Sequence, residues 1–419
     1  MKAIGYVKLF CLTSLLCIAA LLAAALLPQA GIAANISRSL PGLVNEGLYP
    51  QRRAHDRATK LDNLTDSLIM MEVLGMNSSD LGTVFSNPLY LYKGDPLESL
   101  VHYAENPDLE PNGQYVRYWM GFRASLRLLF SFFTYSQIRR LNLLALTALA
   151  ALSMLSVAKR VNVASALGLG ICLLLMRPLI VARSFQFSTC FYIALAALPL
   201  VPWAAQRRER FGGFFLVLGM LTQYLDFYTV PVLTLCLPLL YYFALRIAAG
   251  EETRLRELAA AFLTWMGGYV LFWVEKLLLS TLFTETNGFA NGFSEFLYWM
   301  KREPDANSNK LLALWKKVGT TVCPNREMSL LLLGLLALLL AYALLKLRRG
   351  KLTVKRLGNS ALAATALLPL AWMCAAATPS ANHAFFQYRS LAATFWGLCL
   401  LVTAGAEGCR LRLPARKEE

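Results

Sequence analysis

The sequence predicts an all-α protein that crosses a membrane many times, as a single integral membrane domain over residues 1–419. Hydrophobic residues make up 57% of the chain and charged residues only 16%, whereas an ordinary soluble domain carries about 25% charged residues. The apolar residues gather in long runs, and basic residues cluster between those runs. These observations exclude a water-soluble globular protein, a disordered chain and a secreted disulfide scaffold.

Ten apolar runs are candidates for spanning helices, each of which needs about 20 residues to cross the hydrocarbon core. They lie at residues 6–27, 141–158, 163–182, 189–205, 211–225, 229–245, 258–274, 329–345, 360–377 and 391–404. A cleaved signal peptide is the alternative for the first run. That run exceeds the roughly 7–15 apolar residues of a signal peptide, so we expect an uncleaved helix.

Basic residues predict the orientation of these helices. Clusters such as Lys159-Arg160 and Arg348-Arg349 alternate with short loops, near 184–188 and 226–228, that lack Lys and Arg. Because Lys and Arg are retained on the cytoplasmic side, both termini are expected in the cytoplasm. In this orientation, two long loops, at 28–140 and 277–328, lie outside the cytoplasm.

The net charge of +16 fits this topology and contact with anionic membrane lipid, so a nucleic acid is not an expected partner. No Cys or His spacing indicates a metal site, and no Gly-rich pattern indicates a bound nucleotide. We therefore expect no cofactor. A divalent metal is compatible with the sequence but is not indicated.

The sequence of the first long loop predicts short amphipathic helices rather than a separately folded core. Residues 61–74 place apolar side chains on one stripe. Residues 122–133 predict a helix in the membrane interface, with aromatic residues below and Arg123 and Arg127 above.

Asp62 and Asp66 are the first candidate catalytic residues. Their spacing of four places both carboxylates on one helix face. Such a pair can supply a general base whose partner tunes its pKa. The alternative is a solvated helix face in which Asp62 is only the N-cap.

Aromatic and guanidinium groups alternate after this pair, in Arg117, Tyr118, Trp119 and Arg123. Arg binds phosphate bidentately, and Tyr and Trp prefer the boundary between water and bilayer. This run predicts contact with a lipid-linked phosphate. Simple anchoring at the interface is the alternative.

Further candidates for substrate binding lie near the predicted outer surface. They are Arg177, which precedes a proline within a span, Asp226 between two spans, and the late outer residues His383, Tyr388 and Arg389. Ionisable groups at this depth are functional candidates because burying them is expensive. A solvated hairpin tip is the alternative for Asp226.

One helix, a long outer loop containing carboxylates and amphipathic helices, and then many spans together resemble the GT-C membrane glycosyltransferases. The stretches 61–66, 115–121 and 382–389 also look like those of bacterial membrane proteins of this type. The resemblance implies a GT-C-like fold in the bacterial cytoplasmic membrane. It also implies transfer of a sugar from a polyprenyl-phosphate donor to a cell-envelope glycan or lipid acceptor on the outer face.

Under this resemblance, Asp66 or Asp62 corresponds to the base that deprotonates the acceptor hydroxyl. Arg117, Arg123 and Arg389, together with Arg177, correspond to groups that stabilise the charge of the phosphate. Two alternatives stay open: a transporter or flippase of an envelope lipid or glycan, and a non-catalytic envelope-assembly protein. A transporter has little use for so long a first loop, and a scaffold would tolerate replacement of the carboxylates.

Overall fold

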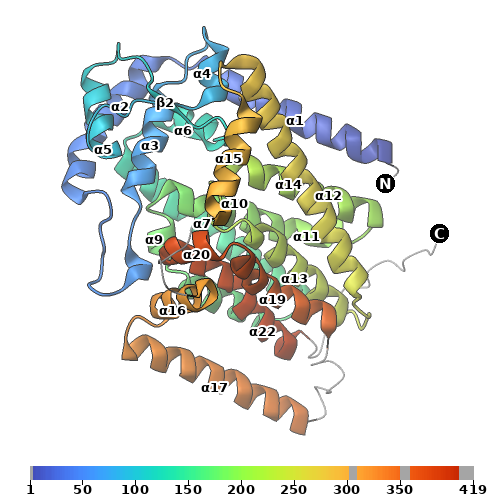
Figure 1. The fold of residues 1–419 in the computed structure, drawn as a ribbon. Helices are drawn as coiled ribbons and strands as arrows, with labels where there is room; N and C mark the ends of the chain where they lie inside the picture. Colours follow the sequence, from blue (N-terminus) through green and yellow to red (C-terminus); the bar gives the residue numbers. More distant parts are fainter. Residues whose placement is uncertain (1–2, 302–308, 350–358, 405–419) are drawn as a thin grey trace.

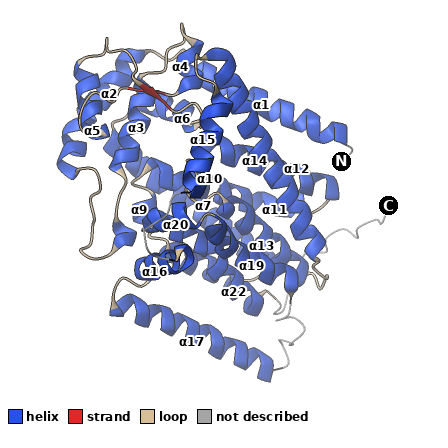
Figure 2. Cartoon of the chain, in the orientation of Figure 1, coloured by secondary structure: helices blue, strands red, loops and turns tan. Residues whose placement is uncertain are grey.

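The computed structural model describes residues 3–301, 309–349 and 359–404. Within these ranges the chain is helical, apart from one short antiparallel sheet in which β1 (Pro88–Leu89) pairs with β2 (Gly113–Gln114) (Figure 2). The predicted all-α class is confirmed.

The first long loop folds into a helical cap on the membrane helices (Figure 1). After α1 (Ala3–Ala25), its elements are α2 (Gln29–Glu46), the 3-10 helix η1 (Arg57–Thr59), α3 (Asn63–Leu74), α4 (Leu81–Ser86), α5 (Pro96–Glu105) and α6 (Phe122–Phe130). The predicted helix at 61–74 corresponds to α3, which begins directly after its N-cap Asp62.

This cap has its own hydrophobic cluster, which the sequence analysis did not expect. Ile36 of α2, Ile69 of α3 and Leu100 of α5 are each completely buried in it. The amphipathic helices turn their apolar faces toward each other as well as toward the membrane helices, since Phe185 belongs to the same cluster. The cap is therefore both a small folded unit and a part of the larger bundle.

The predicted helix at 122–133 corresponds to α6, but the prediction that Arg123 and Arg127 lie on its outer side is wrong. Arg123 and Arg127 are 0% and 1% exposed, because their guanidinium groups point into the protein and bind backbone carbonyls. Arg123 donates to the carbonyl of Val84 at 2.6 Å, and Arg127 donates to that of Val73 at 2.6 Å. Both arginines hold segments of the cap together.

Six segments of the described chain are long and apolar enough to cross a membrane. They are α1, α7 (Tyr135–Arg160), the run Phe185–Ala204, α14 (Leu255–Phe283), α17 (Arg326–Arg348) and the run Ala384–Thr403. The run Phe185–Ala204 contains α10 (Phe185–Ala197), η2 (Leu198–Leu200) and α11 (Val201–Ala204). The last contains α21 (Ala384–Gln387), η3 (Tyr388–Ser390) and α22 (Leu391–Thr403).

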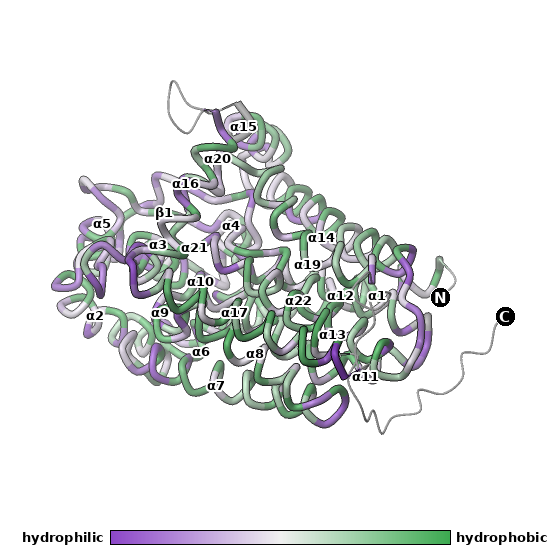
Figure 3. The backbone as a smooth tube through the Cα atoms, turned by 90° about the horizontal axis from the view of Figure 1, so that it is seen from below, coloured by the Kyte–Doolittle hydropathy of each residue, from purple (hydrophilic) through white to green (hydrophobic). Residues whose placement is uncertain are grey.

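Shorter helices complete the bundle. Three are apolar: α8 (Val163–Leu175), α13 (Val232–Ala248) and α19 (Ser360–Ala375). The others are α9 (Pro178–Val181), α12 (Arg208–Leu225), α15 (Gly288–Lys301), α16 (Lys310–Val322) and α20 (Ala377–Asn382). Hydrophobic residues dominate the central helices in Figure 3, and hydrophilic residues gather toward the two ends of the molecule. The chain thus has the character of a multi-pass membrane protein.

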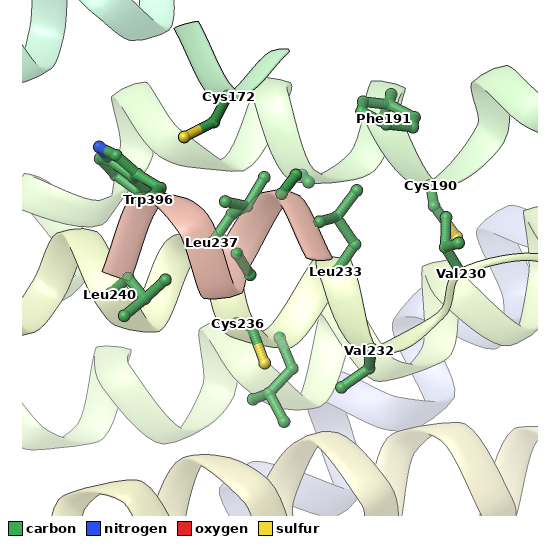
Figure 4. Packing of buried hydrophobic residues seen from close by; sticks show 14 of the residues in the cluster. Cys172, Cys190, Phe191, Val230, Val232, Leu233, Cys236, Leu237, Leu240 and Trp396 are labelled. Atoms are coloured by element: carbon green, nitrogen blue, oxygen red, sulfur yellow. The ribbon is translucent and has the colours of Figure 1, made fainter. Parts of the chain in front are cut away.

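Helix α13 forms the centre of the membrane bundle. Leu233, Leu237 and Leu240 are completely buried, and Figure 4 shows them among side chains of neighbouring helices such as Cys172 and Trp396. Peripheral helices differ, since Leu338 on α17 is 68% exposed. Large apolar side chains on the outside are the arrangement that lipid, rather than water, stabilises.

The proline after Arg177 interrupts a helix, as the sequence predicts. Helix α8 ends at Leu175, Arg177 adopts a left-handed conformation with φ 58°, and α9 begins at Pro178. A proline ring disfavours the helical conformation in the residue before it. The break places Arg177 beside the cap rather than inside the bundle.

Candidate functional site

The two candidate carboxylates lie where the cap meets the first turn of α10. Asp62 is the N-cap of α3, and its Oδ1 accepts the backbone N–H of Thr65 at 3.1 Å. Asp66 follows in the first turn of α3. They are 4% and 0% exposed, so the alternative of a solvated helix face is wrong, although the N-cap is confirmed.

Asp66 accepts three hydrogen bonds from other elements. Its Oδ2 accepts the hydroxyl of Tyr135 at 2.5 Å and that of Ser184 at 3.4 Å, and its Oδ1 accepts the backbone N–H of Phe185 at 3.0 Å. Phe185 is the first residue of α10, where the helix dipole attracts negative charge. Asp66 therefore fixes the cap to both α7 and α10.

The surroundings of Asp66 favour its protonated form. Burial raises the pKa of Asp66 to about 7, against the opposing effects of the nearby Arg139 charge and the Tyr135 hydrogen bond. Arg139 donates to the hydroxyl of Tyr135 at 2.6 Å and to Glu46 at 2.8 Å. A carboxyl with a pKa near neutrality can both hold and release a proton.

Asp62 has a more open neighbourhood on the same side of α10. Its Oδ2 accepts the side-chain amide of Gln186 at 2.8 Å. Burial raises the pKa of Asp62, and hydrogen bonds to Thr65 and the charge of Lys60 oppose that shift. The ammonium of Lys60 lies 3.8 Å from the centre of the Tyr49 ring and 4.6 Å from that of Phe385.

The late outer segment reaches this place from the other end of the chain. Arg389 is 1% exposed, its guanidinium group lies 4.6 Å from the centre of the Phe187 ring, and it donates to the carbonyl of Ala58 at 3.2 Å. It also donates to the carbonyl of Met176 at 3.1 Å. The N–H groups of Arg389 thus bind backbone carbonyls, and these hydrogen bonds connect η3 to the cap.

The neighbours of Arg389 complete this outer junction. His383 stacks on Phe386 with ring centres 5.2 Å apart. The buried hydroxyl of Tyr388 and the Nε of Arg177 have no hydrogen-bond partner among the described residues, and both residues line a cavity of about 10 Å³. A space of this size holds one water molecule. Arg177 itself pairs with Asp56 at 3.0 Å.

Asp226 is buried rather than a solvated hairpin tip. It accepts the Thr189 hydroxyl at 3.2 Å and the backbone N–H of Thr229 at 2.9 Å, and also the Thr229 hydroxyl. Thr189 lies one turn after Gln186 on α10 and bonds to its carbonyl. The first two turns of α10 thus contact all three carboxylates, Asp62, Asp66 and Asp226.

The aromatic and arginine run lies toward α14 and α15 instead. Arg117 pairs with Glu295 at 3.5 Å and lies 4.9 Å from the ring centre of Tyr118. Tyr118 stacks on Phe227 at 4.6 Å. Trp119 is buried and donates to the carbonyl of Phe272 at 2.8 Å.

No contact between described residues joins Arg117 directly to Arg389. The link between their surroundings runs through Tyr118, which lies 5.1 Å from the Tyr228 ring, and through Gln387, which donates to the Tyr228 carbonyl at 3.2 Å. The candidate residues and their neighbours therefore lie in two groups. The Asp62 group, beside α10, comprises Asp62, Gln186, Lys60, Tyr49 and Phe385. The Arg117 group, beside α14, comprises Arg117, Tyr118 and Trp119.

Several polar residues in or near these groups were not predicted from the sequence. Lys60 directly precedes the first carboxylate stretch, and Gln186 is a polar residue between two phenylalanines, so both patterns carried a signal. Glu72 is an acidic residue within an apolar run and is completely buried. Its carboxylate has no hydrogen-bond partner in the described chain, and it interacts with the charges of Arg123 and Lys276.

Among the described residues, no three His, Cys, Asp or Glu side chains are close enough to hold a metal ion. No protein-family model, curated protein or solved structure matches the chain.

Proposed function

We propose that the chain is a GT-C-like glycosyltransferase that moves a sugar from a polyprenyl-phosphate donor to a cell-envelope glycan or lipid acceptor. In this proposal the chain crosses the membrane ten times, both termini are cytoplasmic, and the cap lies on the outer face. The observation that carries the proposal is the Asp62 group, in which a carboxylate, an ammonium and two aromatic rings from distant segments meet beside α10.

Asp62 is the better placed general base of the two carboxylates. Asp66 is completely enclosed, and its oxygens accept from three fixed donors. Asp62 keeps a small exposed fraction and has the half-buried Lys60 close by. We assign the deprotonation of the acceptor to Asp62 and the positioning of α3 against α10 to Asp66.

The reaction needs one proton transfer and one displacement. Asp62 takes the proton of the acceptor hydroxyl, whose oxygen attacks the anomeric carbon of the donor sugar. The bond between that carbon and the phosphate oxygen breaks, polyprenyl phosphate leaves with the bonding electrons, and the anomeric configuration inverts. Lys60 stabilises the charge of the phosphate, while Tyr49 and Phe385 offer ring faces to the sugar.

Membranes that contain the full-length protein and labelled polyprenyl-phosphate sugars supply the test. Asn retains the capping ability of Asp62 but cannot accept the proton, so Asp62→Asn should reduce transfer by about 10²–10⁴-fold. The control is Asp80→Asn, since Asp80 caps α4 in an exposed part of the cap. Transfer at the parent rate by Asp62→Asn would exclude this base, and a transporter or scaffold would then account better for the fold.

A further inference from the structure

An apolar cavity of the membrane bundle lies away from the candidate site. It has a volume of about 280 Å³ and lies between α7, α8, α9 and α10. Its walls include Leu146 and Met154 of α7, Leu173 of α8 and Phe191 of α10. Thr147 is its only lining residue with a polar side chain. Apart from the Thr147 hydroxyl, such a lining has no polar side chain and suits a hydrocarbon chain.

This apolar groove opens to the outside of the bundle and has the depth of one bilayer leaflet. Leu174, one of its lining residues, is 67% exposed. On α7 the groove extends from Leu143 to Met154, which is about 16 Å along a helix. Half of a hydrocarbon core is about 15 Å. A lipid chain of ordinary leaflet length therefore fits the groove from its outer end.

Positive charge gathers at that outer end. Asn142 donates to the carbonyl of Ala182 at 2.9 Å, which places the start of α7 beside Arg183. Arg52 and Arg139 both bind Glu46 at 2.8 Å, and these two arginines are close enough to Arg183 to interact with its charge. Arg183 has no ion-pair partner in the described ranges. Glu46 is thus the carboxylate near all three guanidinium groups, while Asp66 lies near Arg139.

We propose that this groove and its arginine rim bind one anionic glycerophospholipid of the outer leaflet, with an acyl chain along α7 and the headgroup phosphate on Arg183. The phosphate supplies the negative charge that Glu46 alone does not provide. Because the bound lipid joins α7, α8 and α10 near the cap, it stabilises the bundle. This proposal rests on the proposed orientation, with the cap on the outer face, but not on sugar transfer.

Purified full-length protein in a mild detergent allows a direct test. Native mass spectrometry measures retained lipid, and thermal unfolding is followed while phosphatidylglycerol or phosphatidylcholine with the same chains is added. We expect retained anionic phospholipid and a larger increase in Tm with phosphatidylglycerol. Arg183→Gln should raise the phosphatidylglycerol concentration needed for half of that increase by about tenfold or more, since a hydrogen bond to a charged group is lost. Arg140→Gln, at an exposed neighbouring position, should not.

Two alanines of α7 allow a second test with a matched pair of variants. Ala150 lines the groove, whereas Ala151 is exposed on the outside of the helix. Ala150→Phe should abolish lipid retention and Ala151→Phe should preserve it, even if Arg183→Gln does not fold. Equal effects of the two headgroups, or equal retention by the two Phe variants, would overturn the proposal. Polyprenyl phosphate in the groove in place of a phospholipid would also overturn it.

Discussion

The hydroxyl of Tyr135 donates a hydrogen bond of 2.5 Å to the carboxylate of Asp66, and this contact joins the first turn of α7 to the first turn of α3. Arg139, one turn further along α7, donates to the same hydroxyl. Tyr135 and Asp66 are 69 residues apart in the sequence. They show how the cap is fixed to the bundle by a few buried polar contacts in addition to apolar packing.

Tyr135→Phe should destabilise the protein by about 1.5–3 kcal/mol, because it removes a buried hydrogen bond to an acidic group. Tyr92→Phe is the control, since the Tyr92 hydroxyl donates a single hydrogen bond, to the carbonyl of Glu110 at 2.7 Å, and lies in an exposed part of the cap. Thermal unfolding in detergent compares the two variants. Equal losses would show that the Tyr135 contact contributes no more than a surface hydrogen bond.

Stability should depend on pH through Asp66. Because the folded state raises the pKa of Asp66 to about 7, the folded protein binds a proton more tightly than the unfolded chain. Stability from this group is therefore present at low pH, falls as the pH rises from about 4 to about 7, and is constant above that range. Asp66→Asn should reduce the dependence of the unfolding free energy on pH between about pH 4 and pH 7. An unchanged slope in the variant would contradict the assignment.

The helical class and the elements around the carboxylates could be predicted from sequence because they depend on local patterns. The apolar stripe of residues 61–74 and the cap at Asp62 gave the position of α3. The burial of the polar face of this helix, which leaves no residue of α3 exposed, could not be predicted in this way. Asp66 is buried by Tyr135 and Phe185, residues of helices distant in sequence, and periodicity contains no information about such partners.

The arginines illustrate the same limit. Arg123 and Arg389 lie next to aromatic residues in sequence, a pattern that also fits an exposed phosphate site. Their burial is a consequence of unpaired carbonyls at the ends of other elements, such as those of Val84 and Ala58. The partly exposed Arg117 lies next to aromatic residues in the sequence as well. The three-dimensional contacts are needed to distinguish these arginines.

Glu72 should have a pH effect of its own. Burial raises the pKa of Glu72 to about 8, although Arg123 and Lys276 oppose this shift. The sign is the same as for Asp66, so stability should fall between about pH 4.5 and pH 8. Glu72→Gln mimics the neutral acid and should gain stability relative to the parent as the pH rises through this range. Thermal unfolding at pH 5 and pH 9 measures the difference, and a constant difference would exclude titration of Glu72.

Arg389 and Arg117 should differ strongly in their effect on folding. Arg389→Gln leaves several buried carbonyls without their donor and should cost at least about 3 kcal/mol. Arg117→Gln removes a partly exposed ion pair with Glu295 and should cost less than about 1 kcal/mol. Arg389→Lys should restore little, because one ammonium cannot match the geometry of the planar fork. Similar unfolding temperatures for the two Gln variants would contradict this ranking.

Cysteine labelling of intact cells tests the proposed orientation of the bundle. Cys323 between α16 and α17 is exposed and lies in the second long loop, so a membrane-impermeant maleimide should modify it from outside. In a variant with Cys323→Ser and Cys11→Ser, the added change Asp108→Cys in the cap should restore labelling. Glu252→Cys, between α13 and α14, should react only after the membrane is permeabilised, because Asp108 and Glu252 are both exposed residues but lie on opposite sides in the proposed topology. Labelling of Glu252→Cys in intact cells would reverse the orientation and place the Asp62 group on the cytoplasmic face.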